Sequence, residues 1–324
     1  MKLSPVRALI TGGAGFLGSG LVDRLLAEGH GVEVVDDLSS GSLANLKDAR
    51  AHRGNLRFHQ LDVCAPACVE LVGRLKPDVI FHLAAPPEEE GGFEDPARHS
   101  EVALVGLWRL LEGARVAGTR KVVFASSWRC YGDLEPDELP AREHRATRPQ
   151  TPAGVAKRAA LDALATYREH HGVEFSALAL ASVYGPRQLP AASPVAALAQ
   201  ALVVGGTWAV PSGPSVTRDF LYVDDAVDAL ARAAERGSGL LINVGSGEET
   251  SFAALGECAA RLVGAPVRLR RAPAAPGTPA RCALDASRAG IHLGWRPFTP
   301  LEDGMAAMLA AARRSVATAS VTPS

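Results

Sequence analysis

The sequence lacks any long block of like charges. Its 34 Lys and Arg residues nearly balance 35 Asp and Glu residues, for a formal net charge of −1 over 324 residues. A basic block or tail favours nucleic acid or an anionic membrane surface as a partner, so we expect neither. No apolar run reaches the length of a transmembrane helix, and the chain enters a predicted strand without the basic and apolar regions of a signal peptide. We therefore expect a cytoplasmic protein with no membrane partner.

Cysteine is also scarce, and its placement argues against disulfides and metal. The five cysteines are odd in number, and they lie in segments that we predict to be helix or core. Cys64 and Cys68 have the wrong spacing for a CxxC redox pair, and no cluster of His and Cys completes a zinc site. We therefore expect reduced thiols and no bound metal.

Glycines mark the first turn of the chain, at positions 11–18. An apolar run over 6–10 predicts a buried strand before this turn, and apolar residues on one face of 16–26 predict a helix after it. Gly12 suits a tight turn, Gly15 lets the backbone approach a pyrophosphate, and Gly18 lets the helix lie close to the strand. The N–H groups at the start of the helix are free to bind the anion. The turn therefore predicts a phosphate site.

Carboxylates and small residues follow the next predicted strands. Asp36 and Asp37 follow the second strand about 20 residues after the glycines, where a carboxylate accepts a hydrogen bond from a ribose 2′-hydroxyl and repels a 2′-phosphate. We therefore expect NAD rather than NADP. A third strand, 56–61, ends at Asp62, a candidate for the adenine amino group, and a fourth, 79–85, ends in small residues. The expected cofactor contacts here are Gly12, Gly15, Phe16, Leu17, Gly18, Asp36, Asp37, Asp62, Val63, Leu83, Ala84 and Ala85.

Strands and helices alternate up to about residue 180. Parallel strands need crossover connections, so this alternation predicts an α/β fold with a doubly wound parallel (Rossmann) sheet covered on both faces. Beyond 187 the alternation lapses, and Pro and Gly gather at 205–214 and 264–279. We expect an NAD-binding Rossmann domain over 1–181, rejoined by 222–245, and a smaller C-terminal substrate-binding lobe over 182–221 and 246–315. Residues 316–324 are expected to be a disordered tail.

Together these motifs resemble the extended short-chain dehydrogenase/reductase family, the NAD-dependent epimerases and dehydratases of nucleotide sugars. The likeness covers nearly the whole chain. Beyond the glycine-rich turn and Asp36-Asp37, it rests on His82 to Ala85, Ser126-Ser127 followed by Tyr131-Gly132, Lys157, Val183 to Gln188, Arg218 to Phe220, Asn243 to Gly247, and Leu293 to Pro297. The resemblance implies NAD as cofactor, a UDP- or dTDP-linked sugar as substrate, and a homodimer formed by helices 95–117 and 153–171.

The resemblance also assigns catalytic roles. In this family a YxxxK pair carries the proton chemistry: the Lys binds the nicotinamide ribose and lowers the pKa of the Tyr, while a Ser or Thr on the preceding strand binds the reacting hydroxyl. Lys157 matches the Lys and Ser127 the Ser, but Ala153 stands where the Tyr is expected. No Tyr lies between residues 131 and 167. The alternatives are that Lys157 is a solvated surface lysine and that Ser127 only ends its strand.

Two further residues are expected to bind the substrate. Ser182 stands where relatives carry an Asn that contacts the diphosphate, and Arg218 matches an Arg that holds it. A guanidinium fork suits phosphate oxygens, although an ion pair between Arg218 and Asp219 is the alternative. Trp128 follows Ser127, so the Asp-Glu pair of the family's dehydratases is absent and we expect no 4,6-dehydratase. His82 is expected to be a packed strand residue.

Three functions remain open at this point. The chain is an oxidoreductase or epimerase that transfers hydride at a sugar carbon, with its proton passing through water, the substrate, or one of Glu88, His99, Glu143 and His144. Alternatively, it is a ketoreductase or decarboxylase in which the substrate assists the proton transfer. The third possibility is a non-catalytic NAD-binding pseudoenzyme, which the absent Tyr favours.

Overall fold

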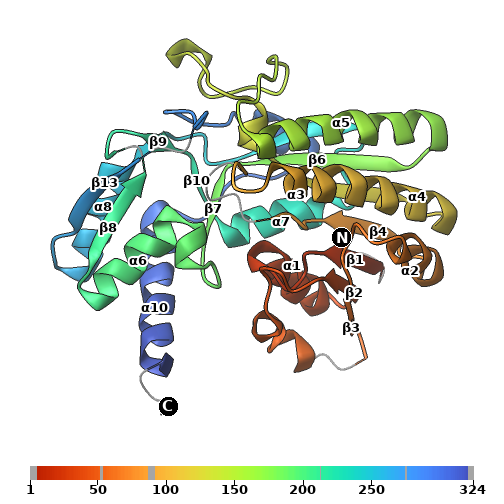
Figure 1. Cartoon of the computed structure of the whole chain (residues 1–324), viewed down its shortest axis with the longest axis horizontal. Helices are drawn as coiled ribbons and strands as arrows, with labels where there is room; N and C mark the ends of the chain where they lie inside the picture. The colour runs from red at the N-terminus through yellow and green to blue at the C-terminus, as the bar shows by residue number, and fades with distance from the viewer. Residues whose placement is uncertain (1–5, 52–53, 87–91, 212, 274–275, 320–324) are drawn as a thin grey trace.

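A seven-stranded parallel sheet forms the centre of the molecule (Figure 1). The computed structural model describes residues 6–51, 54–86, 92–211, 213–273 and 276–319. The strand order is β11-β6-β5-β4-β1-β2-β3, so the sequence order reverses beside β1, where open α/β sheets bind ligands. The predicted doubly wound α/β fold is confirmed. The strands are β1 Arg7–Thr11, β2 Gly31–Asp36, β3 Leu56–Gln60, β4 Val79–His82, β5 Lys121–Ser127, β6 Glu174–Leu180 and β11 Leu240–Val244.

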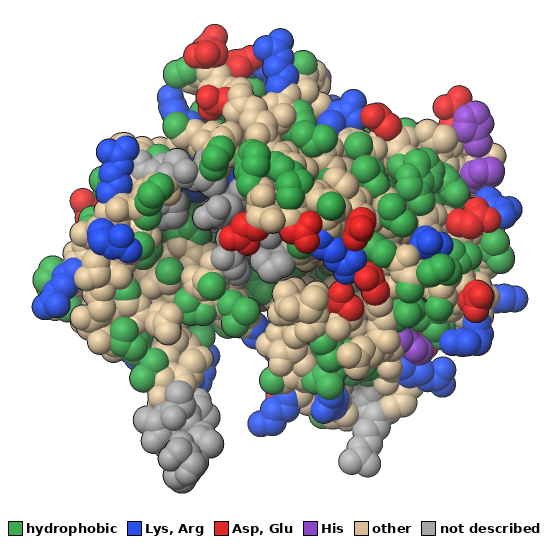
Figure 2. Space-filling view, in the orientation of Figure 1, with side chains coloured by type: hydrophobic (Ala, Val, Ile, Leu, Met, Phe, Trp, Pro, Cys, Tyr) green, Lys and Arg blue, Asp and Glu red, His purple; other side chains and the backbone are tan. Residues whose placement is uncertain are grey.

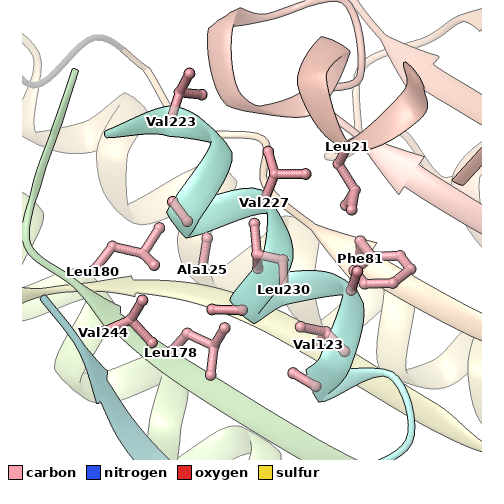
Figure 3. Packing of buried hydrophobic residues seen from close by; sticks show 14 of the residues in the cluster. Leu21, Phe81, Val123, Ala125, Leu178, Leu180, Val223, Val227, Leu230 and Val244 are labelled. Atoms are coloured by element: carbon pink, nitrogen blue, oxygen red, sulfur yellow. The ribbon is translucent and has the colours of Figure 1, made fainter. Parts of the chain in front are cut away.

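Helices cover both faces of this sheet. On one face, α1 (Phe16–Ala27) and α7 (Val223–Ala233) pack against side chains from β4, β5 and β6. Figure 3 shows Val227 and Leu230 of α7 beside Leu21, Phe81 and Val123. On the other face lie α2 (Ala67–Leu75), α4 (Leu107–Ala117) and α5 (Pro152–His171). Within the segment 222–245, α7 packs on α1 and β11 pairs with β6.

The helix expected over 95–117 is divided into three parts. These are α3 (Pro96–Ser100), a π-helical turn η3 (Glu101–Gly106) and α4. Asp95 caps α3 by accepting the Arg98 N–H at 2.9 Å. At Gly106 a Cβ would lie 2.7 Å from Val63 Cγ1, so the turn approaches the end of β3 closely. Helical periodicity predicts the apolar stripe but does not distinguish a π turn from an α turn.

Other segment ends also differ from the prediction. The strand expected over 79–85 ends at His82, and the strand expected over 56–61 ends at Gln60. The last helix continues through Ala319, whereas we expected a disordered tail from Val316. The alanine-rich sequence of this segment favours helix, which accounts for the difference. Residues 320–324 lie outside the described residues.

A smaller lobe lies beside the sheet, at the left of Figure 1. Its helices α6 (Pro194–Val204), α8 (Phe252–Val263) and α10 (Leu301–Ala319) enclose a core that includes Trp208 and Phe252. Three two-stranded sheets complete it: β8 (Thr207–Pro211) with β13 (Arg268–Ala272), β7 (Ser182–Tyr184) with β10 (Phe220–Tyr222), and β9 (Thr217–Arg218) with β12 (Thr250–Ser251). The remaining short helices are η1 Leu43–Leu46, η2 Ala49–Ala51, η4 Trp128–Cys130, η5 Pro136–Glu138, η6 Pro190–Ala192 and α9 Ser287–His292.

All five cysteines are free. Across the described ranges, no group of His, Cys, Asp and Glu is arranged to hold a metal ion. In the same part of the chain, no helix combines the length and apolar character needed to span a bilayer.

Candidate functional site

A cavity of about 790 Å³ lies at the carboxyl edge of the sheet, between β1, β2, β3 and β4. All of the residues predicted to contact the cofactor line it, except Lys157. Most of the remaining lining comes from three segments: 39–42 with Asn45, 94–102 around Arg98, and 187–189. The topology therefore brings the predicted strand ends and the glycine-rich turn to one site.

The glycine-rich turn fits a dinucleotide pyrophosphate. Gly12 has a φ of 70°, and a Cβ there would lie 2.8 Å from Ala84 Cα. A Cβ on Gly18 would lie 2.1 Å from the Gly12 carbonyl oxygen, so only glycine allows α1 to pack this closely. Gly15 caps α1 without a side-chain hydrogen bond, which leaves the first N–H groups of the helix available to an anion.

Asp36 holds a fixed position at the end of β2. Its two carboxylate oxygens accept the N–H groups of Ala14 and Leu38, both at 2.9 Å. Burial raises the pKa of Asp36, while these two hydrogen bonds lower it. The carboxylate is thus anchored to the glycine-rich turn, and its remaining lone pairs suit the hydroxyls of a ribose.

Arg98 is the main site residue that sequence reasoning missed. Its Nη2 lies 3.1 Å from Asp37 Oδ2 and 3.0 Å from Asp62 Oδ2. Burial opposes ionisation of Asp62, but the Cys64 N–H and Arg98 together hold its pKa below the usual value. No local pattern pointed to Arg98, because only the folded sheet brings α3 to the ends of β2 and β3. The single cation therefore joins two carboxylates expected at the adenosine end.

Lys157 and Ser127 lie outside this cavity but near the same edge. The Lys157 ammonium is buried and donates to the Ala125 carbonyl at 2.7 Å, so the solvated-surface alternative is wrong. Ser127 ends β5, the neighbour of β4 in the sheet. Its Oγ accepts the Arg129 N–H at 3.3 Å, which leaves the hydroxyl proton for another acceptor. The Lys157 ammonium therefore lies beside the last residues of the strand that Ser127 ends.

Ala153 lies in the first turn of α5 and is buried. Thr151 caps this helix by accepting the Gly154 N–H at 3.2 Å. A Cβ on Gly154 would lie 2.6 Å from the Arg129 carbonyl oxygen, so the start of α5 packs closely on the loop after Ser127. Close packing thus fixes the position of residue 153, where the family resemblance leads us to expect a phenol, but Ala153 has only a methyl side chain.

Arg218 is buried and has no carboxylate partner within salt-bridge distance among the described residues. Its Nη1 donates to the carbonyls of Thr217 and Ala280 at 2.6 and 3.5 Å, and burial lowers its pKa to about 10. Asp219 instead accepts hydrogen bonds from Ser246, Gly247 and Leu284. The predicted alternative of an Arg218–Asp219 ion pair is therefore wrong.

Ser182 lies at the start of β7, opposite Phe220 of β10. Its backbone N–H donates to the Asp219 carbonyl at 2.9 Å, and its side chain is half-buried. The β7–β10 pairing therefore places Ser182 two residues from Arg218 across the sheet. Neither residue lines the dinucleotide cavity.

The candidate proton carriers differ in their surroundings. His82 is a buried strand residue, as expected; its Nδ1 lies 2.8 Å from Thr11 Oγ1, and burial and the nearby Lys157 charge lower its pKa to about 3. Glu143 accepts the Asn243 N–H at 2.8 Å, and His144 is exposed. His99 is buried and lines the cavity. Glu88 lies outside the described residues.

Comparisons with known proteins identify the family. Residues 8–245 match the model of the NAD dependent epimerase/dehydratase family. The chain is 42% identical to a UDP-glucose 4-epimerase of Mycolicibacterium smegmatis, over 93% of this chain and 96% of the relative. The UDP-glucose 4-epimerase of Thermotoga maritima, solved with UDP-glucose, superposes with a TM-score of 0.89 at 31% identity, over 96% of this chain and 99% of that one.

A second solved structure bears on the cofactor. The UDP-glucose 4-epimerase of Thermus thermophilus, in complex with NAD, superposes with a TM-score of 0.87 at 32% identity, over 95% of this chain and 99% of that one. The expectation of NAD as cofactor is confirmed by this match and by the family itself. The chain belongs to the NAD-dependent epimerase/dehydratase family and is an enzyme of that nucleotide-sugar family.

Proposed function

We propose that this protein is an NAD-dependent 4-epimerase of a UDP-linked hexose. The observation that carries the proposal is the buried Lys157 ammonium, 2.7 Å from the Ala125 carbonyl and therefore beside the end of the strand that carries Ser127. The similarity to UDP-glucose 4-epimerases over nearly the whole chain supports the same reaction. The glycine-rich turn, Asp36 and Asp62 would hold the dinucleotide, with Lys157 on the nicotinamide ribose.

The two lobes divide the work in this proposal. The Rossmann domain, 1–181 with 222–245, binds NAD, and the lobe formed by 182–221 and 246–315 binds the UDP-sugar. Arg218 contacts the diphosphate, since its guanidinium has only backbone acceptors in the described residues and a phosphate supplies the missing charge. Ser182 lies across the β7–β10 pair and contributes a hydroxyl to the same end.

NAD, when bound, supplies the hydride acceptor for the sugar carbon. In this proposal the Ser127 hydroxyl donates a hydrogen bond to the C4 oxygen of the sugar and so fixes its position. With NAD bound as hydride acceptor, oxidation at C4 would release the O4 proton and the reduction that completes epimerisation would take one up, so the protein would have to carry one proton away from O4 and back. Because Ala153 carries no acid or base, we propose that a water held between Ser127 and Lys157 relays this proton to bulk solvent and later relays one back to the sugar oxygen. General acid–base catalysis contributes roughly 10²–10⁴ in rate, so turnover is expected to be slow.

Incubation of the NAD-loaded protein with UDP-glucose and UDP-galactose, followed by NMR of the sugar, tests this proposal. We expect the wild-type protein to interconvert the two. The Lys157→Met variant should lose at least 100-fold in turnover and bind NAD more weakly, whereas Lys47→Met, which changes an exposed lysine, should behave as wild type. Unchanged NAD affinity and turnover in Lys157→Met would show that the assigned role is wrong.

The same experiment distinguishes the other functions. The comparisons offer no support for a pseudoenzyme, and binding of NAD and UDP-sugar without any product is the result that would favour one. A reduced sugar or a released pentose would point instead to a ketoreductase or a decarboxylase.

A further inference from the structure

A tight turn after β7 forms part of the wall of the dinucleotide cavity. Its last residue, Gln188, donates its backbone N–H to the Gly185 carbonyl at 3.3 Å and its side-chain amide to the Val183 carbonyl at 3.1 Å. Pro186 occupies the second position of the turn, and Arg187, at the third position, has a φ of 72°. A turn with Pro second and a positive φ third is of type II, in which glycine is the favoured third residue. The sequence therefore places a long side chain where the backbone disfavours any residue with a Cβ.

The Arg187 side chain ties this turn to α1 and to the segment that follows β2. Its Nη1 lies 2.8 Å from Asp23 Oδ2 on α1, and its Nη2 lies 3.9 Å from Asp48 Oδ2, between η1 and η2. The side chains of Arg187 and Asp23 are 29% and 33% exposed, so salt screens this pair less than a fully exposed pair. The guanidinium therefore links the turn to two elements that border the cofactor cavity, α1 and the segment that carries Asn45.

The turn separates two cavities. Residues 187–189 line the dinucleotide cavity. Pro186 and Arg187 also line a second cavity of about 660 Å³, whose other walls come mainly from α1 and α7. Phe16, the first residue of α1, lines both cavities as well. Because Arg187 borders open space on both sides, close packing does not hold this part of the turn, and the ion pair with Asp23 supplies the restraint.

We propose that Arg187 is a positioning residue for the cofactor: its pair with Asp23 holds the turn beside bound NAD, and NAD leaves only after this pair breaks. The inference takes from the proposed function only that NAD occupies the cavity, and it uses no step of the sugar chemistry. Once the pair breaks, the turn is free to move toward the second cavity, which opens the wall formed by residues 187–189. Asp23 lines the second cavity and not the first, so it acts on NAD through Arg187 rather than by contact.

Exchange of isotope-labelled NAD, bound to the full chain, for unlabelled NAD measures the release rate. We expect Arg187→Gly to release NAD about fivefold faster than wild type, the effect of losing one partly exposed ion pair. Asp23→Asn should cause the same increase, and the double variant should release NAD no faster than either single variant, because both changes break one contact. The matched control is Glu28→Gln, which removes another carboxylate of the α1 end, the partner of Arg24. It should release NAD at the wild-type rate.

Urea unfolding of the NAD-free proteins separates this role from a merely structural one. The unfolding midpoint of Arg187→Gly should equal or exceed that of wild type, because glycine adopts a positive φ without steric cost. Faster release of NAD at an undiminished midpoint is the result that the proposal requires. A lowered midpoint in Arg187→Gly, with faster release in Glu28→Gln as well, would show a general loss of stability and overturn it.

Other results of the exchange experiment would also overturn the inference. Equal release rates in wild type, Arg187→Gly and Asp23→Asn would show that the pair does not hold the cofactor. Slower release in Asp23→Asn with faster release in Arg187→Gly would show that Arg187 contacts the pyrophosphate directly. Additive increases in the double variant would show that the two residues act separately. Each of these results leaves the proposed function standing, whereas a wild-type protein that binds no NAD would overturn both.

Discussion

Arg98 bridges the carboxylates of Asp37 and Asp62 at the predicted adenosine end of the cavity. Without this cation, three carboxylates would face one another there, since Asp36 lies next to Asp37. We expect Arg98→Met to weaken NAD binding about tenfold, which corresponds to loss of roughly 1–2 kcal/mol of charge-assisted hydrogen bonding. Titration of NAD by calorimetry measures this. The control is Arg115→Met, which removes a surface pair with Glu112 on α4; equal losses in both variants would contradict the role.

Ala153 is the residue that most directly limits proton transfer in the proposed reaction. A phenol at this position stands four residues before Lys157, whose charge would lower its pKa. We therefore expect Ala153→Tyr to raise the epimerisation rate at least tenfold, a part of what general acid–base catalysis typically contributes. The matched control is Ala153→Phe, which adds the ring without the hydroxyl. If the Tyr and Phe variants turn over at the same rate while both remain folded, no phenol is needed and another proton route operates.

At the scale of single elements, local chemistry determined how well the fold could be predicted. The helix expected over 153–171 is observed as α5, which begins one residue earlier at Pro152. The turn before α1 was predicted because its close backbone contacts leave no room for a Cβ, as at Gly18. Such positions require glycine, which is visible in the sequence. In contrast, Arg98 contacts Asp37, which lies 61 positions earlier in the chain. The guanidinium carbon of Arg218 likewise lies 5.1 Å from the ring of the distant residue Trp128. Such contacts depend on tertiary packing, and no periodicity encodes them.

The roles of individual site residues stay predictions for a related reason. Grouping of the cofactor residues in one cavity follows from the sheet topology, which alternation of strands and helices predicts. The burial of Lys157 depends instead on how α5 lies on β5. Asp219 forms no ion pair with Arg218 because its carboxylate accepts hydrogen bonds from the loop at Ser246. These arrangements decide between the alternatives that the sequence left open.

The α2–α4 contact gives a matched pair of glycines for testing helix packing. A Cβ on Gly113 of α4 would lie 2.7 Å from Val72 Cβ, whereas a Cβ on Gly73 of α2 would approach nothing closer than 3.7 Å. We expect Gly113→Ala to lower the free energy of unfolding by about 1–3 kcal/mol through overpacking. Gly73→Ala should raise it by roughly 0.5–1 kcal/mol, because alanine favours helix. Urea unfolding followed by circular dichroism measures both, and stabilisation by Gly113→Ala would contradict the close packing.

Lys121 links the start of β5 to the end of the α7 segment and gives a pH test. Its ammonium donates to the Arg236 carbonyl at 2.6 Å, and burial, followed by the charge of Arg120, lowers its pKa to about 8. The pKa of a lysine in the unfolded chain is about 10.4. Between the folded and unfolded pKa values, the unfolded state therefore binds a proton at Lys121 that the folded state has lost. Stability should therefore rise with pH across this window. Urea unfolding of wild type and Lys121→Met at pH 7, 8, 9 and 10 measures the difference in their free energies of unfolding. This difference should grow in favour of wild type as the pH rises. A difference that does not change with pH would contradict the lowered pKa of Lys121.

At the scale of the whole molecule, the two lobes meet at Ala141, which donates its N–H to the Ala283 carbonyl at 2.8 Å and accepts the Asp285 N–H at 2.9 Å. Asn243 at the end of β11 accepts the Tyr131 hydroxyl at 2.6 Å and donates to the Ala141 carbonyl at 2.8 Å. Asp219 of the small lobe accepts the backbone N–H groups of the loop that follows β11. The loop after Ser127 and the segment that carries Arg218 are therefore tied to the same strand end, which keeps the proposed diphosphate and sugar contacts at a fixed spacing.

The α4–α5 face, together with η3, is the surface on which we propose that the chain dimerises. Apolar side chains gather over these helices in Figure 2, and those exposed include Val105 (43%), Trp108 (42%), Val116 (59%) and Val155 (53%). Trp108 of α4 lies 5.5 Å from the Tyr167 ring of α5, so the two helices present one continuous surface. A contiguous apolar patch of this kind is typical of protein interfaces.

Light scattering at micromolar concentration tests the dimer. We expect wild type to have twice the mass of one chain and Trp108→Glu to have the mass of one, because a charge buried at the centre of an apolar interface is costly. The matched control is Ile291→Glu, on α9, which changes a side chain that is 78% exposed outside this face and should leave the dimer intact. A monomeric wild type, or equal dissociation by both variants, would remove the α4–α5 face as the interface. Since α5 also carries Lys157, the dimer would hold this helix from its outer side while β5 holds it from within.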